Sequence, residues 1–351
     1  MPSVDIAVPC YNYGRFLREA VESVLKQSFA DLRVLIIDNG SDDGSSDVAR
    51  QLAAEDARVD LRVFARNVGP HACYNAGVDW AFGTYFFLLD ADDLLTPGSI
   101  ERGVAIMEQN SDLAFAYSTE LLMGLDGEGH VRASLAPKEL VWRLTSGEEF
   151  IRQRCRDPRN IVGAPTILRR TSAQKRIGHY RASLPFTDDL EMWLRLATVG
   201  AVAEANIPQG IRRLHRSQAS EQYREVPVRD FAERVAAFRS FFGNEGAAMA
   251  DARALLGLVE KTIGEEVFWY GLGRHREGDR SNAARCINYG LKLHPIANAP
   301  RLLKWLLSGE VSFYEAGLYI PALVPGASER AALLMNKAAG RRLGVDRRPA
   351  E

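Results

Sequence analysis

The segment Tyr85–Leu95 reads YFFLLDADDLL and joins an apolar run directly to a group of carboxylates. Its first residues have the length and composition of a buried strand, and Asp90, Asp92 and Asp93 follow where that strand would end. Carboxylates crowded at a strand end repel one another unless a cation or hydrogen-bond donors offset their charge. Magnesium-type sites combine a few protein carboxylates with the phosphates of a substrate. The segment therefore predicts a metal and phosphate site.

A surface turn is the plainer alternative for the same segment. In that interpretation Thr96 caps a helix that begins at Pro97. The neighbouring strands help to choose between the two interpretations, because a turn alone predicts nothing about them.

Strands and helices alternate on both sides of this segment. Apolar runs of strand length and stretches with helical spacing follow one another from Val4 to Tyr117. The predicted strands are Val4–Val8, Leu32–Ile37, Val59–Phe64, Tyr85–Leu89 and Leu113–Tyr117, and the predicted helices are Phe16–Gln27, Ser45–Glu55, His71–Phe82 and Pro97–Gln109. This βαβα order predicts an α/β fold with a doubly wound, mostly parallel sheet.

Polar residues follow each of the predicted strands up to Asp93. These clusters are Tyr11–Asn12, Asp38–Ser41, Arg66–Asn67 and Asp90–Asp93. In open parallel sheets, ligands bind beyond the carboxyl ends of the strands. We therefore expect the clusters to converge on one edge and to form a single site from segments that are remote in sequence.

The chain after Glu120 shows weaker strand signals. Residues 120–159 are mixed and punctuated by glycine, which predicts a connection or lid with one helix, Glu148–Arg154, after the cap candidate Ser146. Short strands are predicted at Pro165–Leu168, Val202–Ala205 and Ile211–Leu214, and an amphipathic helix at Asp189–Val199.

Beyond Val228 the pattern is helical. The predicted helices are Phe231–Phe242, Ala252–Trp269, Ser281–Leu293, Pro300–Leu307 and Glu329–Arg341. We predict two domains, an α/β domain at 1–225 and a helical region at 226–351. The segment Tyr270–Pro295 resembles one helix-turn-helix unit of the tetratricopeptide type, and a plain helical hairpin is the alternative.

Composition excludes several classes of protein. The 351 residues include 44 Lys and Arg against 45 Asp and Glu, so no net charge favours nucleic acid or an anionic membrane as a partner. The four cysteines lie far apart, which argues against a zinc site or a disulfide framework and is typical of a reducing compartment. No secretory signal begins the sequence, and no apolar run is long enough to span a bilayer. We expect a cytoplasmic protein, in which the apolar segments Leu302–Leu307 and Phe313–Val324 suit either buried packing or peripheral contact with the inner face of the cell membrane.

A series of motifs over the first two thirds of the chain carries a resemblance to a known family. The motifs are VPCYNYGRFLREAVESVLKQSF (8–29), IIDNGSDDGS (36–45), ARNVG (65–69), FLLDADD (87–93), FTDDLEMWLRLA (186–197) and RRLHRSQAS (212–220). Together they resemble glycosyltransferase family 2 of the nucleotide-diphospho-sugar transferase superfamily. The resemblance implies the GT-A fold, which is a Rossmann-like, mostly parallel sheet flanked by helices.

The resemblance also implies a reaction. It is inverting transfer of a sugar, as by a hexosyltransferase, from a UDP- or dTDP-linked donor to the hydroxyl of a saccharide, lipid-linked or other acceptor. The implied cofactor is Mn²⁺ or Mg²⁺. The implied process is the synthesis of a cell-surface polysaccharide or glycoconjugate. A homo-oligomer is compatible with this function.

Roles for strand-end residues follow from the same resemblance. Tyr11 matches a tyrosine that lies against the nucleotide base, although a packing role is equally compatible with its amphipathic ring. Asp38 matches the first member of an acidic pair, and Asn39 replaces the second. Tyr74 stands where the family commonly has an arginine, so one expected cation is missing. The implied nucleotide-sugar-binding set is Pro9, Tyr11, Asp38, Asn39, Arg66, Asn67, Asp90 and Ala91, where Arg66 has a solvated loop charge as its alternative.

The implied catalytic residues lie in the acidic motifs. Asp90 and Asp92 match the D-x-D element that holds the metal against the donor diphosphate, with Asp92 as the direct ligand. His215 matches a position that approaches the metal or diphosphate, and a structural histidine is the alternative. Asp189 matches the general base that accepts the proton of the acceptor hydroxyl. A helix N-cap with favourable dipole electrostatics is compatible with that role.

Two other functions remain as alternatives. A nucleotidyltransferase that makes sugar nucleotides would need a Gly-rich phosphate loop after the first strand, where PCYNYGRF contains one glycine. A non-catalytic scaffold would not need Asp90, Asp92 and Asp189 together. Release of nucleotide from sugar nucleotides, with and without Mn²⁺, distinguishes these functions.

Overall fold

The computed structural model describes residues 2–124, 139–215, 218, 226–295, 300, 304–305 and 308. The chain divides into two compact units. The first comprises Met1–Glu221 with Ala236–Leu256, and the second comprises Gln222–Val235 with Gly257–Glu351. The division after residue 225 stays a proposal, to which the structure adds that Ala236–Leu256 packs with the first unit.

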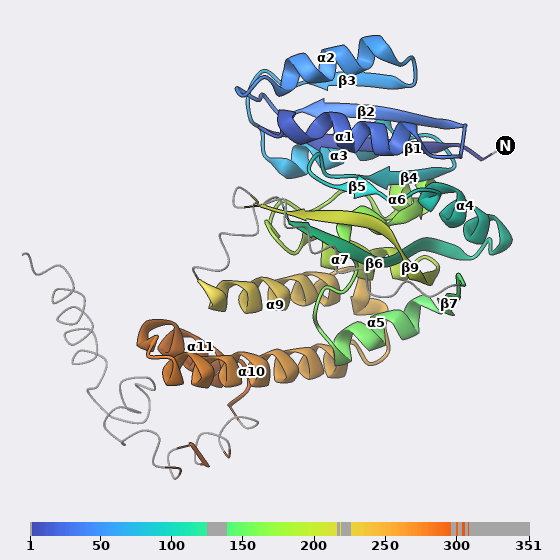
Figure 1. Ribbon diagram of the computed structural model, residues 1–351. Helices are drawn as coiled ribbons and strands as arrows, with labels where there is room; N and C mark the ends of the chain where they lie inside the picture. The colour runs from blue at the N-terminus through green and yellow to red at the C-terminus, as the bar shows by residue number, and fades with distance from the viewer. Residues whose placement is uncertain are drawn as a thin grey trace, which may run out of the picture. The chain divides into compact units, whose positions relative to one another are not determined.

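A mixed sheet forms the centre of the first unit, and its strands can be followed in Figure 1. The strands are β1 (Val4–Cys10), β2 (Leu32–Asp38), β3 (Val59–Val63), β4 (Tyr85–Leu88), β5 (Leu94–Leu95), β6 (Leu113–Gly124), β7 (Trp142–Thr145), β8 (Leu168–Arg170) and β9 (Ala201–Leu214). Their order is β3-β2-β1-β4-β8-β6-β9-β5, and β7 pairs with β9. The first four strands run parallel, as do β6 and β9, whereas β5, β7 and β8 pair antiparallel with their neighbours. The predicted α/β class with a mostly parallel sheet is confirmed.

Helices connect these strands and cover the sheet. They are α1 (Gly14–Leu25), α2 (Ser45–Glu55), α3 (Pro70–Trp80), α4 (Ser99–Gln109), α5 (Gly147–Arg156), α6 (Thr171–Ile177) and α7 (Asp188–Ala197). In α1 the apolar residues Leu17, Val21 and Val24 recur at helical spacing, and all three are buried in the same core as the strand residues. At α5 the predicted cap is present, because the Ser146 hydroxyl accepts a hydrogen bond from the Glu149 backbone N–H over 3.2 Å.

Residues 120–159 were predicted as a connection or lid with one helix; the helix is present as α5, but the absence of strands is wrong. Residues 120–124 continue β6, and residues 142–145 form β7. Glu120 is paired with Gly210 of β9, and Gly124 is paired with Leu214. Pairing with a neighbouring strand therefore decides the conformation here, and the local side-chain pattern does not.

The two short strands predicted after residue 200 are the ends of one strand, β9. Pro208 lies between them, where the pairing with β6 changes register. Proline cannot donate to a strand ladder, so its place is at such an irregularity. The strand predicted at Pro165–Leu168 begins later, as β8 at Leu168, after a short 3₁₀ turn at Ala164–Thr166.

Helices continue through the rest of the described chain as α9 (Pro227–Gly243), α10 (Ala252–Arg276) and α11 (Arg280–Leu293). In the second unit, α10 and α11 form a helical hairpin with close backbone approach. A Cβ added at Gly290 would lie 2.7 Å from the Gly264 carbonyl oxygen. The helix predicted at 329–341, the apolar segment 313–324 and most of 300–307 lie outside the described residues. Among the described helices, none is long and apolar enough to cross a membrane.

Candidate active site

The carboxylates that follow β4 have three different environments. Asp93 Oδ1 accepts a hydrogen bond from the Arg213 backbone N–H over 3.1 Å, which ties the strand tip to β9. Asp92 Oδ2 lies 2.9 Å from Nε2 of His215. Burial, followed by the charge of Asp92, raises the pKa of Asp90 to about 7. This strand tip is therefore a poorly compensated cluster of negative charge.

The turn of the surface-turn alternative is present, because the Asp93 backbone N–H donates to the Asp90 carbonyl over 3.0 Å, but the turn is buried and the predicted cap is absent. The Thr96 hydroxyl donates to the Pro208 carbonyl over 3.0 Å, and the residue before α4 is Gly98 in the left-handed region. Thr96 therefore anchors the chain to β9 and does not cap α4.

His215 is held at the end of β9 by aromatic packing. Its ring lies edge-on to Tyr13 with centroids 5.4 Å apart, and 5.0 Å from the ring of Phe16 at the start of α1. Burial, followed by the charges of Asp92 and Asp90, raises the pKa of the Tyr13 hydroxyl. The loop after β1 and the end of β9 thus meet at the β4 carboxylates.

A second pair of carboxylates begins α7. Asp189 Oδ1 accepts a hydrogen bond from the Leu190 backbone N–H over 2.6 Å, and Oδ2 accepts one from Asn160 Nδ2 over 2.5 Å. Burial raises the pKa of Asp189 to about 6 in spite of these donors. Burial, followed by the charge of Asp189, raises the pKa of Asp188 well above its ordinary value. A carboxylate fixed in this way is a preorganised proton acceptor near neutral pH.

The two acidic groups act on one another across Arg212. The charge of Asp189 raises the pKa of Asp90, and the Arg212 guanidinium lowers the pKa of both. Arg212 also pairs with Glu120 of β6, with 3.4 Å between Nη1 and Oε1. Charges act on one another in this way only when they lie near one another, so the tip of β4 and the start of α7 belong to one site.

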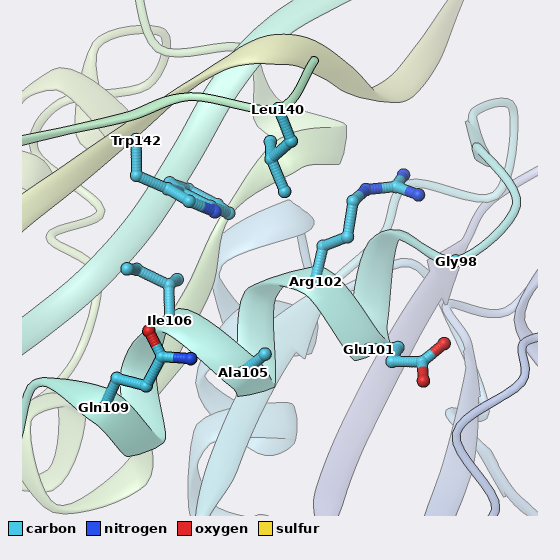
Figure 2. Close-up of a pocket in the computed structure, with 8 residues that line it drawn as sticks. All are labelled: Gly98, Glu101, Arg102, Ala105, Ile106, Gln109, Leu140 and Trp142. Carbon is cyan, nitrogen blue, oxygen red and sulfur yellow. The ribbon is translucent and has the colours of Figure 1, made fainter.

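A hollow beside α4 does not mark this site. It has a volume of about 310 Å³ and lies along α4, where Figure 2 shows Leu140 and Trp142 above the helix. Its lining residues are Gly98, Glu101, Arg102, Ala105, Ile106, Gln109, Leu140 and Trp142. The carboxylates of the β4 tip and of α7 are not among them, so we assign it no part in the chemistry.

Comparisons with known proteins identify the domain that carries the β4 carboxylates. Residues 5–176 match the model of the family described as glycosyl transferase family 2. An uncharacterised glycosyltransferase of Haemophilus influenzae is 24% identical over 224 residues, which are 63% of this chain and 68% of that protein.

Residues 5–176 form a glycosyl transferase family 2 domain.

Solved structures show the fold of this glycosyltransferase domain independently. S. aureus TarS 1–349 in complex with UDP superposes with a TM-score of 0.55 at 16% identity, over 88% of this chain and 87% of that one. The mannosyltransferase PcManGT from Pyrobaculum calidifontis, in complex with GDP-Man and Mn²⁺, gives a TM-score of 0.56 at 14% identity, over 94% and 83%. At these identities the likeness establishes the fold, and the predicted GT-A architecture is confirmed.

Two predicted nucleotide-binding residues, Asn39 after β2 and Asn67 after β3, are hydrogen-bonded to one another. Asn39 Nδ2 donates to Asn67 Oδ1 over 3.1 Å, while Asn39 Oδ1 accepts from the Val68 backbone N–H over 2.9 Å. Asp38 is fully buried and accepts hydrogen bonds from the Ser46 hydroxyl and the Ser41 backbone N–H. The amide at position 39 is explained by this arrangement, because a carboxylate there could accept but not donate.

Gly40 makes the contact between these two loops possible. Its φ is +70°, and a Cβ there would lie 2.4 Å from the backbone carbonyl carbon of Arg66. Only glycine allows that approach without strain. The loops after β2 and β3 are therefore brought together, as their strand-end positions predict.

The remaining predicted contacts differ in exposure. Tyr11 and Arg66 are exposed, which leaves both side chains free to meet a ligand. Pro9 is half-buried, whereas Ala91 is fully buried, so Ala91 offers a ligand no side-chain surface. The roles of these residues in nucleotide binding stay predictions.

Several residues of the acidic site were missed by the sequence reasoning. Asn160 bonds to Asp189, and Arg212, which pairs with Glu120, lowers the pKa of Asp90 and Asp189. Arg212 lies in the quoted motif 212–220 but was given no role, and neither Asn160 nor Glu120 has a residue type or spacing that marks it in the sequence. Strand alternation offers a weak signal, because neighbouring residues of a strand face opposite sides. Arg213 is buried and pairs with Glu19, which leaves Arg212 on the other side of β9.

The residues present fit a divalent cation bound together with a substrate. Among described residues, no three His, Cys, Asp or Glu side chains converge as a complete metal cage. Asp92 and His215 nevertheless provide one carboxylate oxygen and one imidazole nitrogen, which lie 2.9 Å apart. Mn²⁺ and Mg²⁺ sites in phosphate-handling enzymes commonly have so few protein ligands and complete their coordination with phosphate and water.

Proposed function

We propose that this chain transfers a sugar from a nucleoside diphosphate sugar to an acceptor hydroxyl with inversion at the anomeric carbon. The observation that carries the proposal is the placement of Asp189. Backbone and Asn160 donors fix this carboxylate, and it lies within electrostatic reach of Asp90 at the tip of β4. Asp90 belongs to the glycosyl transferase family 2 domain at residues 5–176, and Asp189 follows that match in the chain.

Asp189 accepts the proton of the acceptor hydroxyl as its oxygen attacks the anomeric carbon. The new bond is from that oxygen to carbon, and the broken bond is from carbon to the donor phosphate, whose oxygen leaves with the electron pair. One displacement inverts the configuration, as in single-displacement glycoside hydrolysis. Arg212, with its side chain 40% exposed, provides a cation that lowers the pKa of both Asp90 and Asp189.

Asp92 and His215, with Asp90 beside them, would hold the divalent cation. When bound, such a cation neutralises charge on the departing diphosphate. TarS 1–349 is known in complex with UDP, and PcManGT with GDP-Man and Mn²⁺, which supports a nucleotide-linked donor and a metal. For this chain we propose Mn²⁺ or Mg²⁺ and a UDP- or dTDP-linked sugar.

An acceptor of the saccharide or lipid-linked class and a role in cell-surface polysaccharide or glycoconjugate synthesis complete the proposal. A cytoplasmic location with peripheral membrane contact belongs to it as well. These parts depend on the family resemblance, and an acceptor panel is their test.

The test of the reaction is release of nucleoside diphosphate from a panel of sugar nucleotides with acceptor and Mn²⁺. Asp189→Asn should lower kcat by roughly 10²- to 10⁴-fold, the usual contribution of a general base, and should leave nucleotide binding nearly unchanged. Asp47→Asn is the matched control, because Asp47 also lies in the first turn of a helix but is exposed. Undiminished turnover by Asp189→Asn would exclude Asp189 as the base.

A further inference from the structure

His71 in the first turn of α3 is a buried histidine whose outer ring nitrogen has no hydrogen-bond partner. Its side chain is 11% exposed, and no described residue satisfies Nε2 with hydrogen-bonding geometry. The nearest acidic group is Asp188, whose Oδ2 lies 3.4 Å from Nε2 and whose side chain is also 11% exposed. A buried polar atom without a partner is uncommon and calls for a physical explanation.

The tautomer of the ring follows from its second contact. The ring forms a hydrogen bond with the Leu184 backbone that favours the protonated ring, so the ring is the donor. Because Nε2 is unpartnered, this bond comes from Nδ1. In a neutral imidazole one nitrogen donates and the other accepts. Nε2 of the neutral ring therefore carries a lone pair, and it faces the Asp188 carboxyl.

A bare lone pair and a bare carboxylate at 3.4 Å repel one another, so one proton belongs between them. Two features place that proton on Asp188. Burial lowers the pKa of His71, and the positive end of α3 also disfavours a charged ring. Burial and the charge of Asp189 raise the pKa of Asp188, more than its helix-start backbone donors lower it.

We propose that Asp188 is a protonated carboxyl that donates to Nε2 of His71, and that the negative charge of the Asp188–Asp189 pair resides on Asp189. His71 is then a positioning residue, because it directs the shared proton away from the base. This inference rests on the proposed function for its catalytic meaning. Its physical content, the protonation state of Asp188, does not depend on that function.

Other ionisable groups face the pair and set its surroundings. They are Asp189 on α7 itself, Asp90 at the tip of β4, Tyr74 on α3 and Tyr180 before α7. The rings of Tyr74 and Tyr180 are 5.4 Å apart, and Tyr74 lies 6.1 Å from the ring of His71. Burial raises the pKa of Tyr74. Burial also raises the pKa of Tyr180, so both phenols stay neutral near pH 7 and add no charge beside Asp188.

The catalytic test uses two substitutions that separate the ring nitrogens. His71→Asn keeps a donor at the position of Nδ1 and loses the acceptor at Nε2, whereas His71→Gln reaches the position of Nε2. Without this acceptor, Asp188 either shares its proton with Asp189 or loses it and repels the Asp189 carboxylate. Both changes raise the pKa of the base, so the acid limb of kcat/KM should move upward by about one pH unit. That corresponds to about tenfold lower kcat/KM at pH 6 and little change at pH 8.5. His71→Gln should restore most of the wild-type profile.

A uniform loss across pH in His71→Asn, without rescue by His71→Gln, would overturn the positioning role. Thermal midpoints and nucleotide binding of both variants show whether the fold is intact.

A spectroscopic test reports on the proton without any turnover. The infrared carbonyl band of protonated carboxyl groups should be present at pH 7.5 in the wild-type protein and weaker in Asp188→Asn. Asp90 and Asp93 can contribute to the band, so the difference between the wild-type and variant spectra is the relevant quantity. No difference would overturn the inference. If no sugar nucleotide is turned over and the difference is present, the proposed function fails and the shared proton stands.

Discussion

Polar groups are satisfied in one region of the molecule and crowded in another. The first region is the pair of loops after β2 and β3, and the second is the acidic site between β4 and α7. In the first region Asn39, Asn67 and Asp38 accept and donate among themselves and to nearby backbone. In the second, carboxylates are buried close together and their pKa values rise. Satisfied polar groups stabilise a loop, whereas crowded carboxylates lower stability and are retained where chemistry needs them. The difference supports the proposal that the first region shapes the site and the second region acts on the substrate.

Removing a proposed metal ligand from the acidic site should have the largest effect on function. Asp92→Ala deletes the carboxylate that faces His215, so metal-dependent binding of the donor should weaken by about 100-fold or more. Titration of a sugar nucleotide with and without Mn²⁺ measures the change. Asp43→Ala is a control outside the metal-binding pair, because Asp43 bonds only to Gly14 and Ser45 among described residues. Equal metal dependence in Asp92→Ala and the wild-type protein would remove Asp92 from the ligand set.

Loss of Arg212 should change the pH profile more than the maximal rate. Arg212 lowers the pKa of Asp189, so Arg212→Gln should raise that pKa above its value of about 6. The base is then protonated over a wider range, and kcat/KM at pH 6 should fall by about tenfold while its value at pH 8.5 changes less.

The matched control for Arg212 is Arg143→Gln. Arg143 also pairs with a glutamate across the sheet, but it is exposed and lies on β7. Arg212→Lys should restore part of the profile. An unchanged acid limb in Arg212→Gln would show that Arg212 does not act on the base.

The N-terminal half of the sheet could be predicted closely from the sequence, and the reason is physical. β1, β2 and β4 are buried on both faces, so each is a continuous apolar run between polar loops. The helix Ser45–Glu55 was predicted with its observed bounds. The start of β7 and the end of β6 could not be predicted, because their half-exposed residues depend on pairing with β9.

The acidic site could be predicted in its carboxylates and not in their partners. Asp90 and Asp189 are marked by motifs, and strand-end placement predicts that remote loops meet. Arg212 and Asn160 were given no role, because their relevance depends on the side of β9 that Arg212 faces and on where the fold places the loop after α5 that carries Asn160. His71 has no recognisable spacing to Asp188, from which it is separated by more than a hundred residues.

In the satisfied region, exchange of one amide for a carboxylate should lower stability without removing activity. Asn39→Asp loses the donor to Asn67 and leaves that oxygen facing another, so the free energy of unfolding should fall by about 1–3 kcal/mol. Denaturant unfolding measures the change. Asn206→Asp is the control, because Asn206 also donates once and accepts once, but at an exposed position. Equal losses in the two variants would show that burial of the Asn39 network adds nothing.

In the acidic site the reverse exchange, of a carboxylate for an amide, should stabilise the metal-free protein. The pKa of Asp90 is about 7 in the folded chain against an ordinary value of 3.8. The folded state therefore binds the proton more tightly, and this group lowers stability increasingly as pH rises from about 4 to 7. Asp90→Asn removes that penalty, so Tm should rise by a few degrees at pH 8 and change little at pH 4.

Asp5→Asn is the control for Asp90→Asn and should change Tm in the opposite direction. Asp5 is a buried carboxylate that accepts from the Arg33 guanidinium and from the backbone N–H groups of Phe82 and Gly83. Its exchange removes an acceptor from fixed donors and should lower Tm at pH 8. Thermal scans in chelator at both pH values make the comparison. A lower Tm for Asp90→Asn at pH 8 would mean that its carboxylate is as well satisfied as that of Asp5, and the contrast between the two regions would no longer hold.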